Sequence, residues 1–345
     1  MSRLPQVLDH PNPTPLVTQA YEDCLHIEDE LTAHQEDRAQ NLVERKRVVN
    51  VRILGYFLRE GPTDTAIRYV ALGVVECERD VERIVMLGEY YDKWFIRPFR
   101  NAETSFQDSS PLRRFKSEYS SLKEHGEAKA KLLTHPRDSD EAREAALIRD
   151  DWRCVLSRTV DYSSYHEDHE AFPPPPKGEK HMISTTTVHH IVPILTKPQT
   201  FAVFASFGYP SLEEELGEER IHSLKNLMTV ETSVQPPLDE QCMWFQPIEG
   251  VPNSYRREIR AADRVLPHHL EQWRVPEILE FGTERPELDL PCPRLLALHA
   301  AGAKVAQSSG LYDFLEEVDA MVLASNADAP SADLLAVKLT NVVVD

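Results

Sequence analysis

The sequence has few cysteines and no long apolar run. Its five cysteines, Cys24, Cys77, Cys154, Cys242 and Cys292, are odd in number and lie far apart. Such a set suits neither a disulfide framework nor the closely spaced Cys pairs of a zinc site, so free thiols are expected. No stretch of 18 apolar residues is present, so we expect no transmembrane helix. The first residues lack the apolar segment of a secretory signal, and a cytoplasmic protein is therefore expected.

Positive charge is also scarce. Lys and Arg total 38 against 57 Asp and Glu, which gives a formal net charge of −19. Because binding to nucleic acid phosphates depends on clustered cations, nucleic acid is not expected as a partner, and neither is a membrane. The composition, 41% hydrophobic and 28% charged, is typical of a globular protein. A chain of 345 residues suits one large domain or two smaller ones.

The first hundred residues have a helical pattern. Four prolines predict an irregular lead-in over residues 1–15. From Leu16 onward, apolar residues recur at three- and four-residue steps between charged ones, which predicts a helical region over 16–100. Its first part is one long or broken helix over 16–59, and Asp64 is a candidate cap of the next. Further along, one face carries the predicted core residues Ile84, Leu87, Tyr91, and Trp94 or Phe95.

The remaining chain divides into three parts. Residues 101–140 are polar and form a candidate linker. Residues 141–285 alternate helical patterns with β-branched runs and form the core, and 286–345 contain a C-terminal helix and a tail. The end of this tail, 337–345, is apolar and β-branched and is a candidate edge strand. An insert with four consecutive prolines is interpreted as an exposed loop. Its histidines, interpreted as solvated rather than as metal ligands, are His166, His169 and His181.

Two adjacent histidines end the most clearly patterned strand. The run STTTVHHIVP is β-branched and predicts a strand that stops at Pro193, with His189 and His190 on opposite sides. A helix is expected before it, running into a strand that begins around Arg153. After it, the pattern predicts a variable loop with a short helix, and then a short helix or turn around Asn226. A strand LMTV, a turn at the two prolines of QPPLD and an apolar strand MWF follow.

These segments together resemble the HNH endonuclease module. The strand ending in His-His-Ile-Val-Pro, then Ser-Leu-x-Asn-Leu-Met-Thr, then Leu-Asp before an aromatic strand, is similar to the version found in fungal proteins of this length. CVLS at 154–157 and the helix at 291–310 extend the resemblance, which covers roughly residues 65–320. It implies an α+β fold: a helical N-terminal region, a ββα-metal (HNH-like) core over 141–285 and a C-terminal helix.

The resemblance also implies roles for the strand-end residues. His190 takes the place of the general base, His189 that of a metal ligand, and Asn226 that of the residue that orients the base and its loop. A His on the closing helix completes the family's metal site, and Gln235 stands there. A neutral amide is a poor replacement for imidazole toward a transition metal, and the prolines after Gln235 disfavour helix at that residue. We therefore expect no cofactor; the alternative is a divalent metal at His189 and Gln235.

The charge of this region agrees with the expected loss of nuclease chemistry. Residues 151–260 contain ten Lys and Arg against sixteen Asp and Glu, a net charge of −6. Five of the acids lie in the loop 213–219, between the two halves of the motif. A nucleic acid in a groove there would be repelled. The basic residues Arg256, Arg257 and Arg260 are interpreted as a solvated face.

Three functional hypotheses follow. The first is a degenerate HNH-like scaffold that serves as a cofactor-free cyclase or pericyclase for an apolar small molecule in fungal natural-product biosynthesis. Its candidate hydrogen-bonding residues are His189, His190 and Asn226, and its candidate pocket residues are Trp244, Phe245 and Tyr255. The second is a metal-dependent HNH endonuclease, and the third a non-catalytic interaction module. The sequence indicates neither the substrate nor the oligomeric state. It also leaves open whether Asp239, Glu231 or His222 approaches the histidine pair.

Overall fold

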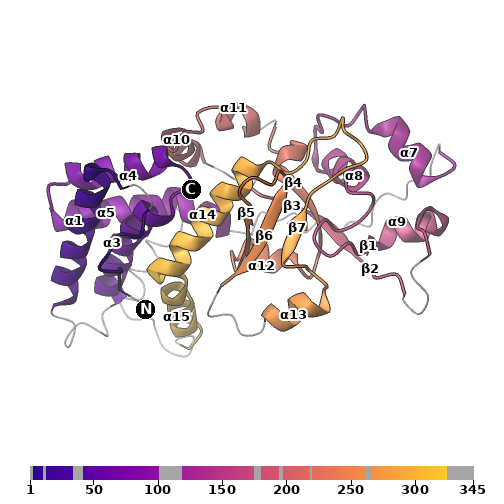
Figure 1. Cartoon of the computed structure of the whole chain (residues 1–345). Coiled ribbons are helices and arrows are strands. Elements are labelled where there is room, and N and C mark those ends of the chain that lie inside the picture. The colour runs from indigo at the N-terminus through magenta and orange to yellow at the C-terminus, as the bar shows by residue number, and fades with distance from the viewer. Residues whose placement is uncertain are drawn as a thin grey trace. The chain divides into compact units, whose positions relative to one another are not determined.

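The chain forms two compact units in a computed structural model. Unit 1 consists of Met1–Arg97, Lys197–Pro210 and Ala301–Asp345, and unit 2 of Pro98–Thr196 and Ser211–Ala300. Helices dominate and the strands form small sheets, which confirms the α+β class (Figure 1). The structure describes residues 3–10, 13–33, 42–100, 119–174, 180–193, 197–217, 220–260 and 266–324. Residues 101–118 of the expected linker 101–140, and the whole candidate edge strand 337–345, therefore lie outside the described residues. The rest of the expected linker contains a helix and belongs to unit 2.

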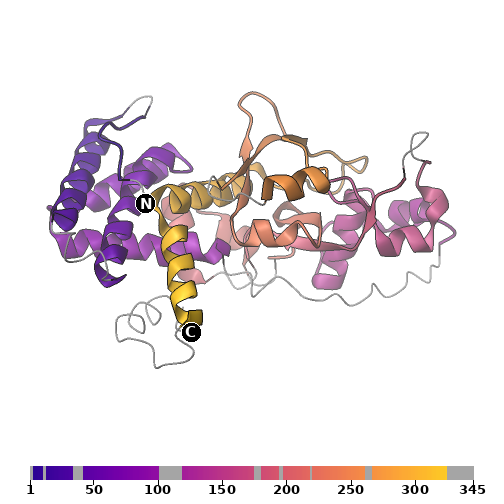
Figure 2. The same ribbon diagram turned by 90° about the horizontal axis from the view of Figure 1, so that it is seen from below.

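Unit 1 is helical. Its first four helices pack against one another, as both ribbon views show (Figures 1 and 2). The helices of the unit are α1 (Pro15–Thr32), α3 (Leu42–Glu60), α4 (Asp64–Glu76), α5 (Val81–Tyr91), the π-helical η1 (Asp92–Ile96), α10 (Pro198–Ser206) and α15 (Leu311–Ala324). Within the described residues, the predicted helical region over 16–59 contains α1 and α3. Two helices contain residues of both units, α6 (Arg97–Arg100) and α14 (Pro293–Ser309).

Side chains that precede these helices define where they begin. The Thr63 hydroxyl accepts a hydrogen bond from the backbone N–H of Ala66 at 3.0 Å and caps α4. Asp80 caps α5 in the same way. The prediction that Asp64 is the cap is wrong, because Asp64 is already the first helical residue. A cap must have an extended backbone so that its oxygen can turn back onto the free N–H groups, and Thr63 has that backbone.

Aromatic rings form the centre of unit 1. The interacting pairs among them have ring centroids between 5.1 and 6.1 Å apart, and all the rings are buried. The rings belong to Phe57, Tyr91, Phe95, Phe204 and Phe207. This confirms the prediction that the aromatic residues near position 91 are core, and of the two alternatives Phe95 is the fully buried one. The last two rings come from α10 and the residue after it, far along the chain.

Unit 1 also buries matched charges between its helices. The Asp92 carboxylate lies against the Lys46 ammonium and the Arg97 guanidinium, the latter at 2.7 Å. Burial opposes ionisation of Asp92, but the two cations outweigh it and lower its pKa to about 2. Arg52 and Glu28 form a second buried ion pair, between α3 and α1. Breaking a buried pair leaves an uncompensated charge, so these contacts favour one register of the helices.

All the strands found among the described residues lie in unit 2. β1 (Val160–Asp161) and β2 (Ile183–Ser184) pair in parallel, β3 (Thr186–His190) and β4 (Leu227–Glu231) pair antiparallel, and β5 (Met243–Pro247), β6 (Ser254–Ile259) and β7 (Ile278–Glu280) form an antiparallel sheet in that order. Its helices are α7 (Leu122–Lys129), α8 (Ser139–Arg149), α9 (Tyr162–Glu167), η3 (His169–Ala171), α11 (Leu212–Leu216), η4 (Leu224–Asn226), α12 (Gln235–Asp239) and α13 (Leu266–Gln272). The predicted strands STTTVHHIVP, LMTV and MWF are confirmed as β3, β4 and β5.

Two sequence predictions for unit 2 are wrong. No strand begins at Arg153, which makes only an isolated bridge to Val160. The chain turns back there, with positive φ at Trp152 and Arg158. The two prolines of QPPLD form no turn, because α12 begins at Gln235 and places both of them in its first helical turn. Proline is tolerated there, since the first N–H groups of a helix have no intrahelical acceptor.

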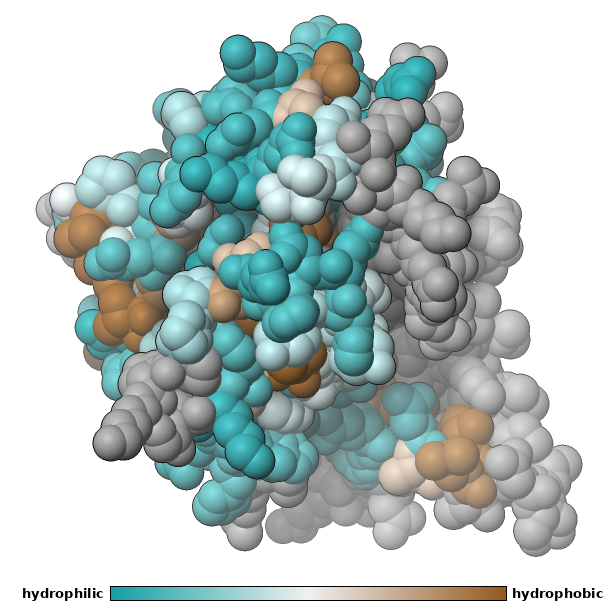
Figure 3. Space-filling view, turned by 90° about the vertical axis from the view of Figure 1, so that its right-hand side faces the viewer, coloured by the Kyte–Doolittle hydropathy of each residue, from teal (hydrophilic) through white to brown (hydrophobic). Residues whose placement is uncertain are grey.

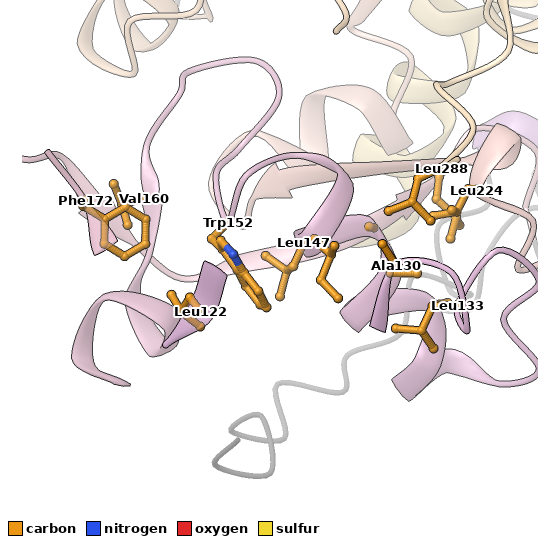
Figure 4. Close-up of a cluster of buried hydrophobic side chains, with 14 residues drawn as sticks. Leu122, Ala130, Leu133, Leu147, Trp152, Val160, Phe172, Leu224 and Leu288 are labelled. Atoms are coloured by element: carbon orange, nitrogen blue, oxygen red, sulfur yellow. The ribbon is translucent and has the colours of Figure 1, made fainter. Parts of the chain in front are cut away.

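Helix α8 is the hydrophobic centre of unit 2. Its apolar face packs with Trp152, Leu224, Leu227 and Leu288 in a buried cluster (Figure 4). Arg149, at the end of this helix, is only 1% exposed. Its guanidinium pairs with Asp150 and donates to the backbone carbonyls of Leu224, Leu227 and Asp289. One side chain thus joins α8 to the η4–β4 segment.

The surface near α7 and α9 is mainly polar. Figure 3 shows hydrophilic side chains over most of this face, with hydrophobic colour in small separate patches. Exposed hydrophobic residues of this part of the chain include Leu132, at 73%, and Tyr162, at 52%. Within the described residues, no helix has the length and apolar character needed to cross a membrane.

Candidate functional site

The strand-end histidines project from opposite faces of β3. His189 pairs with Met228 of β4, and His190 pairs with Leu227. Successive side chains of a strand alternate between its two faces, so the two imidazoles have different surroundings. The sequence prediction that they point to opposite sides is confirmed. A single pocket lined by both rings does not fit this arrangement.

His189 lies against a carboxylate. Its Nδ1 is 3.0 Å from Oδ1 of Asp239, at the end of α12, and its side chain is only 6% exposed. A carboxylate at this distance accepts a hydrogen bond from Nδ1–H and leaves the lone pair on Nε2. The ring is then oriented. This is the arrangement of a general base with its orienting carboxylate.

A third residue, His299 of α14, completes the surroundings of His189. Its ring centroid is 6.4 Å from that of His189, and its Nε2 is 3.4 Å from the backbone carbonyl of Leu238. Burial, together with the neighbouring His189, lowers the pKa of His299 to about 4, so the ring is neutral at pH 7. Sequence reasoning missed this residue. The available signal was a histidine within an apolar helical run, which by itself does not indicate a site.

His190 lies against a second imidazole on the other face. Its Nε2 is 3.2 Å from Nδ1 of His222. Burial, followed by the neighbouring His222 and His189, lowers the pKa of His190 to about 3. Burial also lowers the pKa of His222. The two rings therefore form a neutral pair at pH 7, in which one nitrogen donates and the other accepts.

The structure answers which residue approaches the histidines. Asp239 reaches His189 and His222 reaches His190. Glu231 is paired with Thr186, at the other end of β3, and its carboxylate accepts from Ser157 and Ser233.

The side chain of Asn226 makes hydrogen bonds that hold the backbone. It is fully buried, and its Oδ1 accepts from the N–H of Val192 at 2.8 Å. Its Nδ2 donates to the carbonyls of Val192 and Ile221, at 2.9 and 3.0 Å. Both amide hydrogens are therefore used, and the expected donation to a bound molecule does not fit. The role that the resemblance implied, orienting the loop after the strand, does fit these bonds.

The donor set for a metal is poor. Gln235 starts α12 with a neutral amide, and His189 directs Nδ1 at Asp239 one turn further on. A single imidazole and a single carboxylate beside an amide suit a transition metal less well than the two or three imidazoles it prefers. In the part of the chain that the structure describes, no three His, Cys, Asp or Glu side chains are arranged to hold a metal ion.

The three candidate pocket aromatics do not share a face. Phe245 lies opposite Arg257 in the β5–β6 register, and Tyr255 lies opposite Pro247. Both therefore face the side where Phe281 packs, with ring centroids 6.4 and 5.0 Å away. Trp244 alternates to the other face, so one pocket lined by all three rings is not formed. All are buried, and Trp244 Nε1 and the Tyr255 hydroxyl find no hydrogen-bond partner among the described residues.

The histidines of the insert gather around one tyrosine. The ring centroids of His166, His169 and His181 are 6.3, 6.4 and 5.6 Å from that of Tyr165. The insert is partly helical, as α9 and η3, rather than entirely loop. His166 and His169 are exposed and His181 is half-buried, which is close to the solvated interpretation made from the sequence.

Comparisons of the chain with family models, with curated proteins and with solved structures find no match. Of the candidate residues, His189 is the one whose imidazole lies against a carboxylate, that of Asp239.

Proposed function

We propose that this chain is a metal-independent acid–base enzyme for an apolar small molecule, of the cyclase or isomerase type, on a degenerate HNH-like scaffold. The observation that carries the proposal is the 3.0 Å contact between Nδ1 of His189 and the Asp239 carboxylate. Support for the scaffold comes from the sequence resemblance and from the order of β3, β4 and α12, which is strand, strand, helix.

The proposed reaction moves one proton and needs no co-reactant. Nε2 of His189 removes a proton from a carbon beside a carbonyl, and Asp239 stabilises the imidazolium that forms. The same imidazolium returns the proton to the substrate at another atom, so that the enzyme ends unchanged. A buried pair suits this step, because a charge is stabilised more strongly where water is excluded. General acid–base catalysis of this kind contributes about 10²–10⁴-fold.

The charge of the region supports a neutral substrate. Three glutamates occupy α11, within the acidic loop between β3 and β4. With a net charge of −19, the chain repels polyanions such as nucleic acids at long range. An apolar molecule has no such penalty.

A metal-dependent endonuclease is the second candidate. The observation that favours it is the neutral His190, since nuclease chemistry needs a neutral imidazole with its other nitrogen held by a partner. In that case His190 would be the base and His189, with Gln235, would have to hold the cation. The two candidates thus assign the base to different histidines, and this difference decides the experiment.

The test compares two reactions in the same set of variants. The first is the Kemp elimination of 5-nitrobenzisoxazole, an apolar probe whose product phenolate is coloured and forms when a base removes the C3 proton. We expect His189→Gln to lower its rate by about 10²-fold or more, and Asp239→Asn by about tenfold, with His190→Gln as the matched control that retains it. The second is nicking of supercoiled plasmid with Mg²⁺ or Mn²⁺, which we expect none of the proteins to perform. Nicking by the natural chain that disappears in His190→Ala would overturn the proposal in favour of the endonuclease.

A further inference from the structure

The segment Arg3–Val7 has no regular secondary structure and lies on the helices of unit 1. Leu4, Pro5 and Val7 all contact α1 or α3 through their backbone or side chains. Pro15 and the residues after it already belong to α1, so the chain returns onto its own helix. We call this segment, Arg3–Val7, the arm. The surface beneath it is the arm groove, formed by Tyr21, Glu28, Gly55 and Arg59.

Leu4 is the apolar anchor of this segment. It is only 2% exposed, although it lies in a stretch with no regular secondary structure. Its side chain lies over Gly55 of α3, where an added Cβ would be 2.6 Å from the leucine Cδ2. Glycine in a helix interior is destabilising relative to alanine. Here the missing side chain provides the space that the leucine fills.

Buried polar side chains bind the backbone of the segment. The N–H of Leu4 donates to the Glu28 carboxylate at 3.0 Å, and the carbonyl of Pro5 accepts from the Tyr21 hydroxyl at 2.7 Å. Glu28 and Tyr21 are both only 2% exposed. Further along, the carbonyl of Val7 accepts from Arg59 at 2.9 Å. Three successive backbone contacts around one apolar anchor are the features of a peptide-binding groove.

Arg3 adds charge complementarity at the end of the groove. Its guanidinium lies 3.5 Å from the Asp29 carboxylate and donates to the Thr32 hydroxyl at 3.3 Å. The groove thus matches an arginine, then a leucine, then a proline. This motif occurs in the arm itself, and therefore also in every other copy of the chain.

The connection between the arm and α1 would allow the arm to bind to a second copy of the chain. Residues 8–14 separate Val7 from α1, and seven extended residues span about 23–25 Å. The sequence places prolines at positions 11, 13 and 15, and the residue before a proline is disfavoured from helix. A connection that prefers extended backbone permits the arm to reach a neighbouring molecule without losing any contact of the groove.

We propose that the arm groove is a peptide-recognition site that takes the same Arg-Leu-Pro arm from a second copy of this chain, giving an arm-exchanged dimer. In the dimer, every contact that the arm makes with its own chain is made with the other chain instead. Only the conformation of the connection differs between the two forms. The balance between the forms then depends on protein concentration.

Cysteine cross-linking tests the exchange directly. One variant carries Leu4→Cys and a second, differently tagged, carries Gly55→Cys, with the half-exposed Cys292 changed to serine in both. After the two are refolded together at high concentration and oxidised, we expect a covalent pair of the two tags on a non-reducing gel. The double variant Leu4→Cys/Gly55→Cys is the control and should close within one chain. Monomers alone in the mixture, beside a double variant that does cross-link, overturn the exchange. If the double variant does not cross-link, the concentration dependence of the dimer decides instead.

Sedimentation velocity gives a second test that leaves Gly55 unchanged. The dimer fraction of the natural chain should rise with concentration and be lost in Leu4→Asp. The matched control is Val7→Asp, because Val7 belongs to the same segment but is 76% exposed. It should dimerise like the natural chain. A natural chain that stays monomeric at every concentration, or equal loss of the dimer in both variants, would contradict the proposal.

Discussion

At the scale of single residues, the site depends on which group lies beside each imidazole. His189 and His190 are neighbours in sequence, yet one faces a carboxylate and the other a second imidazole. The sequence predicted that the two rings point to opposite sides, because alternation in a strand is local. It left open which of three residues approaches them, because those contacts join positions more than 30 residues apart. The prediction that Asn226 donates to a bound molecule does not fit for the same reason, since its partners are backbone groups that lie elsewhere in the chain.

The buried His299 should make unit 2 sensitive to mild acid. An unfolded histidine titrates near 6.5, whereas His299 has a pKa of about 4 in the folded chain. Between these values the unfolded state binds more protons, so the free energy of unfolding falls as the pH drops from 6.5 to 4. We expect His299→Phe to make this fall smaller by on the order of 1–3 kcal/mol.

Urea unfolding at several pH values measures this effect. His268→Phe, at an exposed position, is the control and should leave the slope unchanged. If the free energy of unfolding depends on pH equally in His299→Phe and in the natural chain, the burial of this ring does not control the acid response.

Asp92 should make the stability of unit 1 fall at a lower pH than that of unit 2. Its pKa of about 2 lies below the unfolded value, so its contribution is complete above about pH 4 and is lost as the pH falls toward 2. The variant Asp92→Asn leaves the Lys46 ammonium buried without its carboxylate. We expect it to lower the free energy of unfolding by about 3–5 kcal/mol at pH 7.

Thermal or urea unfolding followed by circular dichroism checks this value. The control is Glu82→Gln, which removes the exposed pair with Arg47 and should change stability by less than about 1 kcal/mol. Equal, small effects of both variants would mean that the buried pair contributes no more than a surface pair.

At the scale of helices and strands, the sequence predicted most elements. It was wrong where the backbone conformation of one or two residues sets the local structure. Periodicity located α1, α3, α5, β3, β4 and β5, because each has an apolar face that repeats over several residues. It placed a turn at Pro236 and Pro237, where the chain instead begins a one-turn helix short enough to hold both prolines in its first turn. It predicted a strand at Arg153, where an apolar run is part of a tight reversal.

Arg149 joins two elements of unit 2, and its removal should separate them. The variant Arg149→Met leaves Asp150 and the carbonyls of Leu224 and Leu227 without this donor inside a buried cluster. We expect a loss of about 3–5 kcal/mol in the free energy of unfolding, measured in urea.

The matched control lies next to the N-terminal end of the same helix. Arg137 forms an exposed pair with Glu141, and its side chain is 84% exposed. Arg137→Met should therefore change stability by less than about 1 kcal/mol. Similar losses in the two variants would show that α8 depends on its surface charges and not on Arg149.

At the scale of the whole molecule, the α+β class was predictable and the grouping of segments was not. Composition and pattern indicate helices before a mixed core, which the structure confirms. The segment Lys197–Pro210 was predicted only as part of a variable loop between the strands of the motif. It belongs to unit 1, where Phe204 and Phe207 pack with Phe57 and Phe95. No local pattern reports a contact between residues about 150 positions apart.

The three-part composition of unit 1 has a consequence for synthesis on the ribosome. Helices α1 to α5 emerge first, but the rings of α10 and the α15 contact between Arg45 and Glu317 are translated much later. The apolar faces of the early helices therefore stay exposed to solvent until nearly the whole chain has left the exit tunnel. A nascent chain stalled before residue 197 should be a strong client of chaperones that bind exposed apolar surface.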